Sequence, residues 1–237
     1  MRVLVTRPRP DAETFAARLH ALGHTTIIEP LIDIAFLDGP PLDLTGVQAL
    51  AFTSTNGARA AADRTRERNI RVITVGAATA IEATTLGFAD VSVSAGEGVD
   101  GLHRAIVGGL NPMAGTILHV TGTVTAGDLK GMLTASGFTT RTEPIYEARA
   151  AETLSGALTA ELSANLVDAA TFFSPRTATL FAALVEAENL ASACRSMTAL
   201  ALSAAVANAL QPLAFRDIRI AADPTAEAML ARLGGRI

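Results

Sequence analysis

The sequence of 237 residues is poor in the side chains that most often build metal and redox sites. It contains one cysteine, one tyrosine and no tryptophan. The single thiol, Cys194, excludes an intramolecular disulfide framework and any site built from several cysteines. The 19 basic and 23 acidic residues give a net charge of -4, which argues against a broad basic face for nucleic acid. We therefore expect no nucleic-acid partner, and a protein of the reducing cytoplasm.

The common catalytic and cofactor motifs are missing as well. No GxGxxG follows the first apolar run, and the sequence contains no GxxxxGK[ST], HExxH or GxSxG. The histidines, which lack metal-ligand spacing, are His20, His24, His103 and His119. We therefore expect no metal site and no cofactor.

Long hydrophobic runs are also rare. Ser196 to Phe215 is uncharged and approaches the roughly 20 residues of a membrane helix. It is interrupted by Ser203, Asn208, Gln211 and Pro212. Met197 to Leu202 is typical of a buried strand and Ala204 to Leu210 of a short helix. Arg7 breaks the first apolar run too early for a signal peptide, so we expect neither membrane insertion nor export.

What the chain does contain is a repeated alternation of short apolar runs and longer alanine-rich amphipathic stretches, which is typical of an α/β fold. The predicted strands are Val3–Thr6, Thr26–Glu29, Ala49–Thr53, Val72–Val75, Val91–Ser94, Ile117–Thr121, Thr139–Thr142, Ala169–Phe173, Thr198–Leu202 and Ile218–Ala221. The main predicted helices are Pro10–Leu22, Gly57–Arg68, Ala77–Leu86, Ala126–Ser136, Leu154–Ala164, Arg176–Ala187 and Thr225–Leu233. Helical connections of this length join parallel strands, so we expect mainly parallel sheets flanked by helices.

An internal repeat indicates two related units. Leu22–Leu31 is echoed by Ser136–Ile145, with Gly23 and Gly137 at the same separation of 114 positions as Pro30 and Pro144. Two shorter echoes relate strand ends, Val3–Thr6 to Leu118–Thr121 and Ala51–Ser54 to Thr171–Ser174.

The two Glu-Pro steps of the repeat predict where the chain passes between the units. Pro30–Phe36 and Pro144–Ala148 both favour extended structure, because proline fixes its own φ and biases the preceding residue away from helix. We predict a two-stranded extended connector, a discontinuous first domain of residues 1–35 and 147–237, and a second domain of residues 36–146. A cleft between two such domains would be the default ligand site.

Hydroxyl-rich turns between strands and helices are the candidate binding elements: Thr53–Gly57, Val75–Thr79 and Phe173–Thr177. A serine or threonine there can cap its own helix, and free backbone N–H groups there can bind an anion. Several such turns at one sheet edge would suit a ligand with many carboxylates. Arg7 and Arg176 could add fork-shaped contacts to carboxylates.

Tyr146, the only tyrosine, falls in the predicted connector. Two interpretations remain open at this point. The ring could be an aromatic plug packed between domains, or the phenol could face a cleft and donate a proton or a hydrogen bond.

Over nearly its full length the chain resembles the uroporphyrinogen-III synthase family, the cyclising enzymes of tetrapyrrole biosynthesis. The resemblance rests on VLVTRP (Val3–Pro8), the LGH to EPL region (Leu22–Leu31), FTSTNGA (Phe52–Ala58), VGAATA (Val75–Ala80) with LGF (Leu86–Phe88), PIYEAR (Pro144–Arg149) and FFSPRTATLF (Phe172–Phe181). It implies two α/β domains, no cofactor, and a lyase reaction on hydroxymethylbilane, which closes with inversion of ring D and loss of water.

The resemblance also implies site residues. It places Tyr146 at the tyrosine that assists loss of the substrate hydroxyl, and Ser54, Thr79 and Ser174 among the groups that hold substrate carboxylates. Two features depart from the family pattern: Ser203 and Val206 replace an expected glycine-threonine turn, and Gly122–Leu129 lacks an expected arginine. We expect a monomer. The alternative reading is a noncatalytic two-domain binding protein for a polycarboxylate metabolite.

Overall fold

The structure, a computed structural model, describes residues 1–95, 98–125 and 127–233. The chain divides into two compact units. Unit 1 comprises Met1–Asp33 and Arg149–Ile237, and unit 2 comprises Ile34–Ala148. The boundaries expected after residues 35 and 146 each lie two residues from those of the units.

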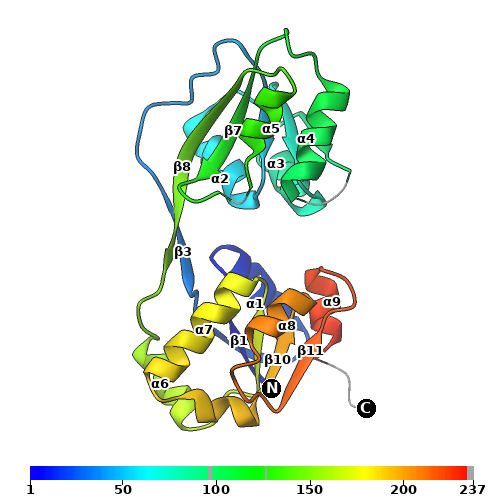
Figure 1. The fold of residues 1–237 in the computed structure, drawn as a ribbon. Coiled ribbons are helices and arrows are strands. Elements are labelled where there is room, and N and C mark those ends of the chain that lie inside the picture. The colour runs from blue at the N-terminus through cyan, green and yellow to red at the C-terminus, as the bar shows by residue number, and fades with distance from the viewer. Residues whose placement is uncertain (96–97, 126, 234–237) are drawn as a thin grey trace. The chain divides into compact units, whose positions relative to one another are not determined.

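Unit 1 is a five-stranded parallel sheet in the order β11-β10-β9-β1-β2 (Figure 1). Its strands are β1 (Arg2–Val5), β2 (Thr25–Ile28), β9 (Ala169–Phe172), β10 (Thr198–Ala201) and β11 (Asp217–Ile220). Its helices are α1 (Asp11–Ala21), α6 (Gly156–Ser163), α7 (Pro175–Ala187), α8 (Ala204–Ala209) and α9 (Ala226–Ala231), with a 3₁₀ turn at Ala191–Ser196. Phe172 and Phe181 fill the core beneath α6, α7 and α8, and Phe15 and Met229 fill the core beneath α1 and α9.

Unit 2 is a six-stranded sheet in the order β3-β8-β7-β4-β5-β6. Its strands are β3 (Ile32–Phe36), β4 (Val47–Phe52), β5 (Arg71–Thr74), β6 (Asp90–Val93), β7 (Thr116–Gly122) and β8 (Thr140–Ala150). Its helices are α2 (Thr55–Arg64), α3 (Ala77–Thr85), α4 (Gly98–Gly109) and α5 (Leu129–Ala135). Apolar side chains of α2 and α3 pack into one core cluster, and those of α4 and α5 pack into a second one.

The strands β3 and β8 contain the two points at which the chain passes from one unit to the other. Ala151 donates to the carbonyl of Leu31, and Leu37 donates to the carbonyl of Ile145. The residue numbers run in opposite directions along the two strands, so the pair is antiparallel, in contrast to the parallel ladders elsewhere in the sheet.

The predicted α/β class with mainly parallel sheets is confirmed, and each predicted strand has a counterpart. Three details of the prediction were wrong. The predicted strand Thr139–Thr142 and the extended stretch after it form one continuous strand, β8. The helix predicted to reach Arg68 ends at Arg64, because the Arg68 guanidinium binds the carbonyls of Ala62, Thr65 and Leu86.

The third error concerns two helices of unit 2: α4 was not predicted, and α5 begins later than predicted. Helix α4 was not predicted, because its four glycines give it a low helix propensity. It forms because Leu102 and Ile106 are buried on the sheet. Helix α5 begins at Leu129, where Asp128 caps it by accepting from the amide of Gly131. Ala126, the predicted start, lies outside the described residues.

The internal repeat corresponds to equivalent structure in the two units. Gly23 and Gly137 end α1 and α5 with φ of 79° and 85°, values that favour glycine. The ladders pair Val5 with Ile28 and His119 with Thr142, which keeps the separation of 114. Val5 therefore corresponds to His119, and the echo of Val3–Thr6 in Leu118–Thr121 is out of register by one residue.

Candidate active site

The candidate site of unit 2 lies where the connections of its sheet change direction. From β4 the chain runs to β5 and β6 on one side, whereas β7 and β8 lie on the other side. Ligands of open parallel sheets bind at the carboxyl ends of strands at such a switch point. Here Ser54 follows β4, and Gly122 is the last residue of β7.

Tyr146 reaches this point because β8 contains a bulge. Thr121 pairs with Pro144, but the next residue, Gly122, pairs with Tyr146, so β8 has one residue more than β7. Successive side chains of a strand point to opposite faces, and regular pairing would put Tyr146 on the face that Pro144 occupies. The bulge instead places its ring against the core cluster of α2 and α3.

The phenol of Tyr146 is hydrogen bonded to Ser54. Its hydroxyl lies 2.8 Å from Ser54 Oγ, and the ring is half-buried. Ser54 also caps α2, since its Oγ accepts from the amide of Gly57 at 3.1 Å. Two residues that the sequence placed on separate segments are thus in direct contact.

Thr79 lies in the next turn along the same sheet edge, after β5. It is buried, at 7 % exposure, and is the third residue of α3. Gly76 occupies the N-cap of α3, and no side chain at this cap accepts a bond from the first turn. The exposed residues Ala77 and Ala78 therefore present backbone N–H groups at a helix start, where anions are favoured.

Arg7 belongs to unit 1, where it follows β1. Its guanidinium forms an ion pair with Asp11 at 2.6 Å and lies 4.3 Å from the centre of the Phe173 ring. Its Nε is buried without a hydrogen-bond partner among the described residues. The side chain is thus held in place by an acidic and an aromatic neighbour.

Ser174 and Arg176 also belong to unit 1. Ser174 caps α7 by accepting from the amide of Thr177, and its hydroxyl lies 2.8 Å from the Thr177 hydroxyl. Arg176 is an exposed residue in the first turn of α7. At the turn that departs from the family pattern, Ser203 caps α8 by accepting from the amide of Val206.

The groups whose pKa values are strongly shifted lie elsewhere. Burial lowers the pKa of His119 to about 4 and raises that of the Cys194 thiol to about 11, so both are neutral near pH 7. In the part of the chain that is described, no group of three or more His, Cys, Asp or Glu side chains could hold a metal ion. None of the described helices is long and apolar enough to cross a membrane.

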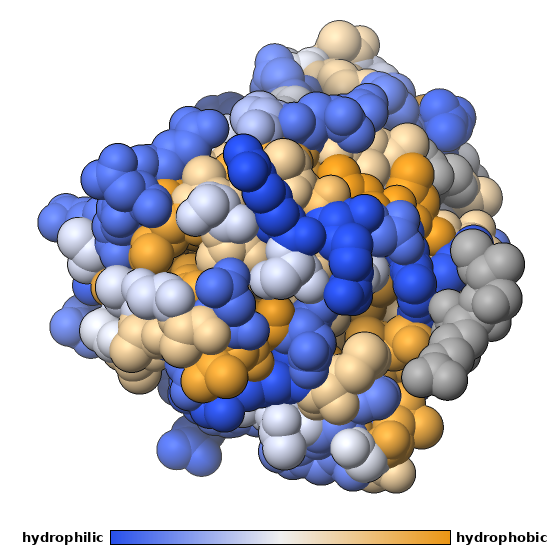
Figure 2. Space-filling view, turned by 90° about the horizontal axis from the view of Figure 1, so that it is seen from below, coloured by the Kyte–Doolittle hydropathy of each residue, from blue (hydrophilic) through white to orange (hydrophobic). Residues whose placement is uncertain are grey.

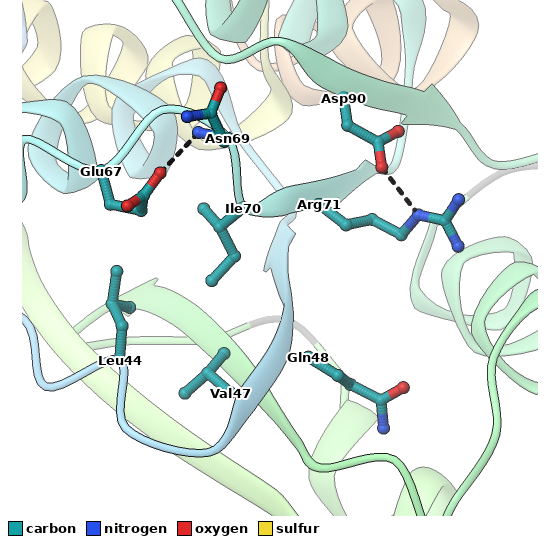
Figure 3. Close-up of a pocket in the computed structure, with 8 residues that line it drawn as sticks. All are labelled: Leu44, Val47, Gln48, Glu67, Asn69, Ile70, Arg71 and Asp90. Atoms are coloured by element: carbon teal, nitrogen blue, oxygen red, sulfur yellow. Dashed lines mark hydrogen bonds and ion pairs between the residues drawn. The ribbon is translucent and has the colours of Figure 1, made fainter.

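A pocket of about 610 Å³ in unit 2 lies at the opposite sheet edge, where β4, β5 and β6 begin (Figure 3). Figure 3 shows Arg71 paired with Asp90, and Glu67 bonded to the backbone of Asn69. Its remaining lining residues are Leu44, Val47, Gln48 and Ile70. Its charged groups already have partners, and none of the predicted site residues lines it.

Sequence reasoning missed Gly122. A Cβ atom at this position would lie 2.9 Å from Cε2 and 3.1 Å from Cζ of Tyr146, so the ring packs directly against the glycine. A glycine directly after the predicted strand Ile117–Thr121 was the signal in the sequence, and it did not indicate which side chain packs there.

Comparison with known proteins gives a consistent result. The sequence model of a family described as uroporphyrinogen-III synthase HemD matches residues 13–231. The structure of uroporphyrinogen-III synthetase from Helicobacter pylori is similar with a TM-score of 0.64 and 19% identity, over 98% of each chain. A mutant uroporphyrinogen III synthase from Thermus thermophilus has a TM-score of 0.52 and 18% identity, over 98% of this chain and 97% of that chain. At these identities the structures show a shared fold. No curated protein sequence matched significantly.

Proposed function

This chain belongs to the uroporphyrinogen-III synthase family, and we propose that the switch point of unit 2 carries the chemical step of its reaction. The enzyme is a cyclising lyase of haem biosynthesis that acts on hydroxymethylbilane. Ring closure to uroporphyrinogen III proceeds with inversion of ring D and loss of water. The observation that carries the assignment of the site is the hydrogen bond between Tyr146 and Ser54 at 2.8 Å.

The reaction needs few catalytic groups. The pyrrole nitrogen of the substrate can expel hydroxide from the hydroxymethyl group, which gives an electrophilic azafulvene. The azafulvene can close spontaneously to the unrearranged type I ring, so the enzyme has to direct attack toward the spiro intermediate that permits inversion of ring D. Positioning and electrostatics supply this bias.

Tyr146 is assigned the role of proton or hydrogen-bond donor to the departing hydroxide. Its half-buried phenol lies at the carboxyl edge of the sheet, where a ligand of a parallel sheet is expected. Ser54 and the backbone around it support the phenol from the side of α2. A positioned donor of this kind contributes about 10²- to 10⁴-fold in other enzymes.

The carboxylates of the substrate are assigned to helix starts. In unit 2 the first turn of α3, with Thr79, supplies backbone N–H groups without a side-chain cap. In unit 1 the assignment rests on Ser174, Arg7 and Arg176, which lie at or near the carboxyl ends of β9 and β1. Arginine forks suit carboxylates because they donate two parallel bonds.

The alternative function is a noncatalytic binder of polycarboxylates, and product analysis separates the two. Hydroxymethylbilane generated enzymatically in the same vessel should be converted to the type III isomer by this protein. A binder would leave only the spontaneous type I isomer. The type I product alone, from folded protein, would refute the assignment.

We also propose that the enzyme acts as a monomer in the cytoplasm. The buried free thiol of Cys194 is compatible with a reducing compartment. On the face drawn in Figure 2, hydrophobic residues are exposed in small groups between hydrophilic ones, which is usual for a surface without a permanent partner. Sedimentation of the purified protein measures its oligomeric state.

A further inference from the structure

The ring of Tyr146 packs tightly against one glycine and lies near a second. Gly122 lies against it so closely that a Cβ atom would come within 2.9 Å of Cε2. At Gly57 a Cβ atom would lie 3.9 Å from Cε1 and 3.3 Å from the carbonyl oxygen of Val120. Real Cβ contacts below 3.0 Å are essentially never seen, so any side chain at Gly122 would displace the ring. The site requires a glycine there for the ring to lie as it does.

The hydrogen bonds of Ser54 limit what its hydroxyl can do. A serine hydroxyl has one proton to donate and two acceptor positions. One acceptor position of Ser54 is occupied by the amide of Gly57. The hydrogen bond to the phenol uses either the Ser54 proton or its second acceptor position. If Ser54 donates to the phenol oxygen, the phenol keeps its own proton for the substrate. Ser54 would then also stabilise the negative charge that grows on that oxygen as the proton leaves.

The bulge in β8 supplies an independent constraint on the same ring. The amide of Thr123 donates to the carbonyl of Tyr146, so the backbone is tied to the end of β7 beyond the bulge. The bulge determines the face of the sheet on which the Tyr146 ring lies. Gly122 allows the ring to pack closely against the end of β7, and Ser54 holds the phenol hydroxyl by a hydrogen bond.

We propose that Ser54 and Gly122 are positioning residues that act through Tyr146, rather than groups that contact the substrate themselves. The proposal rests on the assignment of the reaction to the Tyr146 site. It differs from the sequence-based expectation for Ser54, which was a contact to a substrate carboxylate. Its consequence is that replacing Ser54 affects the reaction only while the phenol is present.

The composition of the chain provides a direct probe of the ring. Because Tyr146 is the only tyrosine and tryptophan is absent, the tyrosine band of the near-ultraviolet circular dichroism reports this one ring. Ser54→Ala and Gly122→Ala should each weaken the band. Ser54→Thr keeps a hydroxyl and a helix cap, and should retain it.

Two matched controls remove trivial explanations. Thr225→Ala removes the same kind of cap from α9, where Thr225 accepts from the amide of Ala228. Gly108→Ala adds a methyl group at a helical glycine where no atom beyond the neighbouring backbone of its own helix lies within 4 Å of the new Cβ. Both should leave the tyrosine band unchanged. An unchanged band in Ser54→Ala and Gly122→Ala would overturn the proposal.

A double-mutant cycle tests the link to the reaction. Ser54→Ala should slow type III formation about three- to tenfold, the range given by loss of one ordinary hydrogen bond. In a Tyr146→Phe background, Ser54→Ala should cause no further slowing. The same slowing in both backgrounds would show that Ser54 acts on the substrate or on folding, and would overturn the proposal.

The circular dichroism measurement and the double-mutant cycle together distinguish failure of the positioning role from failure of the proposed function on which it rests. If the wild-type protein forms no type III isomer, the assigned reaction fails, whereas the dichroism of the free protein still tells whether Ser54 and Gly122 hold the ring. If the wild type is active but the cycle shows no coupling, the reaction stands and the positioning role fails.

Discussion

The two units have equivalent sheets but traverse them in a different chain order. In unit 1 the spatial order β2-β1-β9-β10-β11 begins with the first two strands of the chain. The equivalent order in unit 2 is β8-β7-β4-β5-β6, so the last two strands of that unit take the places of β2 and β1. The shared turn geometry at Gly23 and Gly137 supports this equivalence. The difference shows that the same spatial arrangement of strands can form from different orders of those strands along the chain.

The turns between strands and helices in the two units differ in the hydrogen-bond partners of their polar groups. Ser54 and Ser174 cap equivalent helices with nearly the same backbone, φ and ψ of -154° and 158° against -146° and 149°. Ser54 pairs with the phenol of Tyr146, however, whereas Ser174 pairs with the hydroxyl of Thr177 in its own turn. Gly76 leaves α3 without a side-chain cap, whereas Ser203 caps the equivalent helix, α8. The start of α3 in unit 2 therefore lacks the side-chain cap that its equivalent in unit 1 has, so equivalent turns of one fold can differ in their binding properties.

The largest expected effect concerns the central strands. His119 of β7 is buried and corresponds to Val5 of β1. Its pKa falls from 6.5 to about 4 on folding, so below pH 6.5 the unfolded chain binds a proton that the folded chain does not. Protonation of His119 therefore does not destabilise the fold above pH 6.5. As the pH drops to 4, the free energy of unfolding should decrease by about 3 kcal/mol because of this residue. His119→Leu, which makes β7 apolar like β1, should abolish this part of the pH dependence.

The two units carry separate probes for this measurement. Fluorescence of Tyr146 follows unfolding of unit 2, and reaction of Cys194 with a thiol reagent active at acidic pH follows opening of unit 1. Urea titrations should show the acid sensitivity of the wild type in the tyrosine signal and its loss in His119→Leu. The same pH slope in both proteins would contradict the role of His119.

A second, smaller effect should follow from Tyr146→Phe, which removes the hydroxyl that pairs with Ser54 in unit 2, whereas in unit 1 the hydroxyl that pairs with Ser174 is that of Thr177 in the same turn. Type III formation should slow by at most about 100-fold, because the substrate already ionises with the help of its own pyrrole. The type I fraction should rise as released substrate closes spontaneously. Steady-state rates and isomer ratios measure both effects, and thermal unfolding of the same preparation serves as the control. An unchanged rate and ratio would leave Tyr146 with a packing role alone.

The sequence predicts the sheets well because buried apolar runs and their spacing are local signals. It misses α4 because packing of Leu102 and Ile106 overrides a glycine-rich sequence. The sequence-based prediction places the end of α2 too late, at Arg68. The guanidinium of Arg68 binds the carbonyl of Leu86, at the end of α3, and this contact between distant residues cannot be read from the local sequence. Such contacts depend on the assembled fold.

The candidate site is predictable only in part for the same reason. Tyr146 and Ser54 are recognisable from the family resemblance, but they lie 92 residues apart, and their contact depends on a bulge that local propensity does not reveal. The Glu-Pro step predicts extended structure at Pro144, which is observed. It does not predict the extra residue that turns the tyrosine ring to the other face.

The third prediction compares two helix starts directly. Ala77→Pro and Ala204→Pro both place proline at the first helical position, after extended residues Gly76 and Ser203, where proline is tolerated. In unit 2 the change removes an N–H group assigned to a substrate carboxylate, so KM should rise about tenfold or more with little change in kcat. In unit 1 the N–H group removed at Ala204 is not assigned to the substrate, so the change in KM should be several-fold smaller. Equal KM values for the two variants would refute the distinction between the turns.

The smallest effect is expected from the caps themselves. Ser54→Ala and Ser174→Ala each remove one bond to a backbone amide and one bond to another hydroxyl. Because these losses match, each variant should lower the local stability of its own helix by about 1 kcal/mol. Native-state hydrogen exchange in α2 and α7 measures the two values separately, and Thr225→Ala in α9 gives the cost of losing a cap alone. A cost for Ser54→Ala well above that for Ser174→Ala would mean that the bond to Tyr146 stabilises unit 2, and its effect on the reaction would then have to be corrected for partial unfolding.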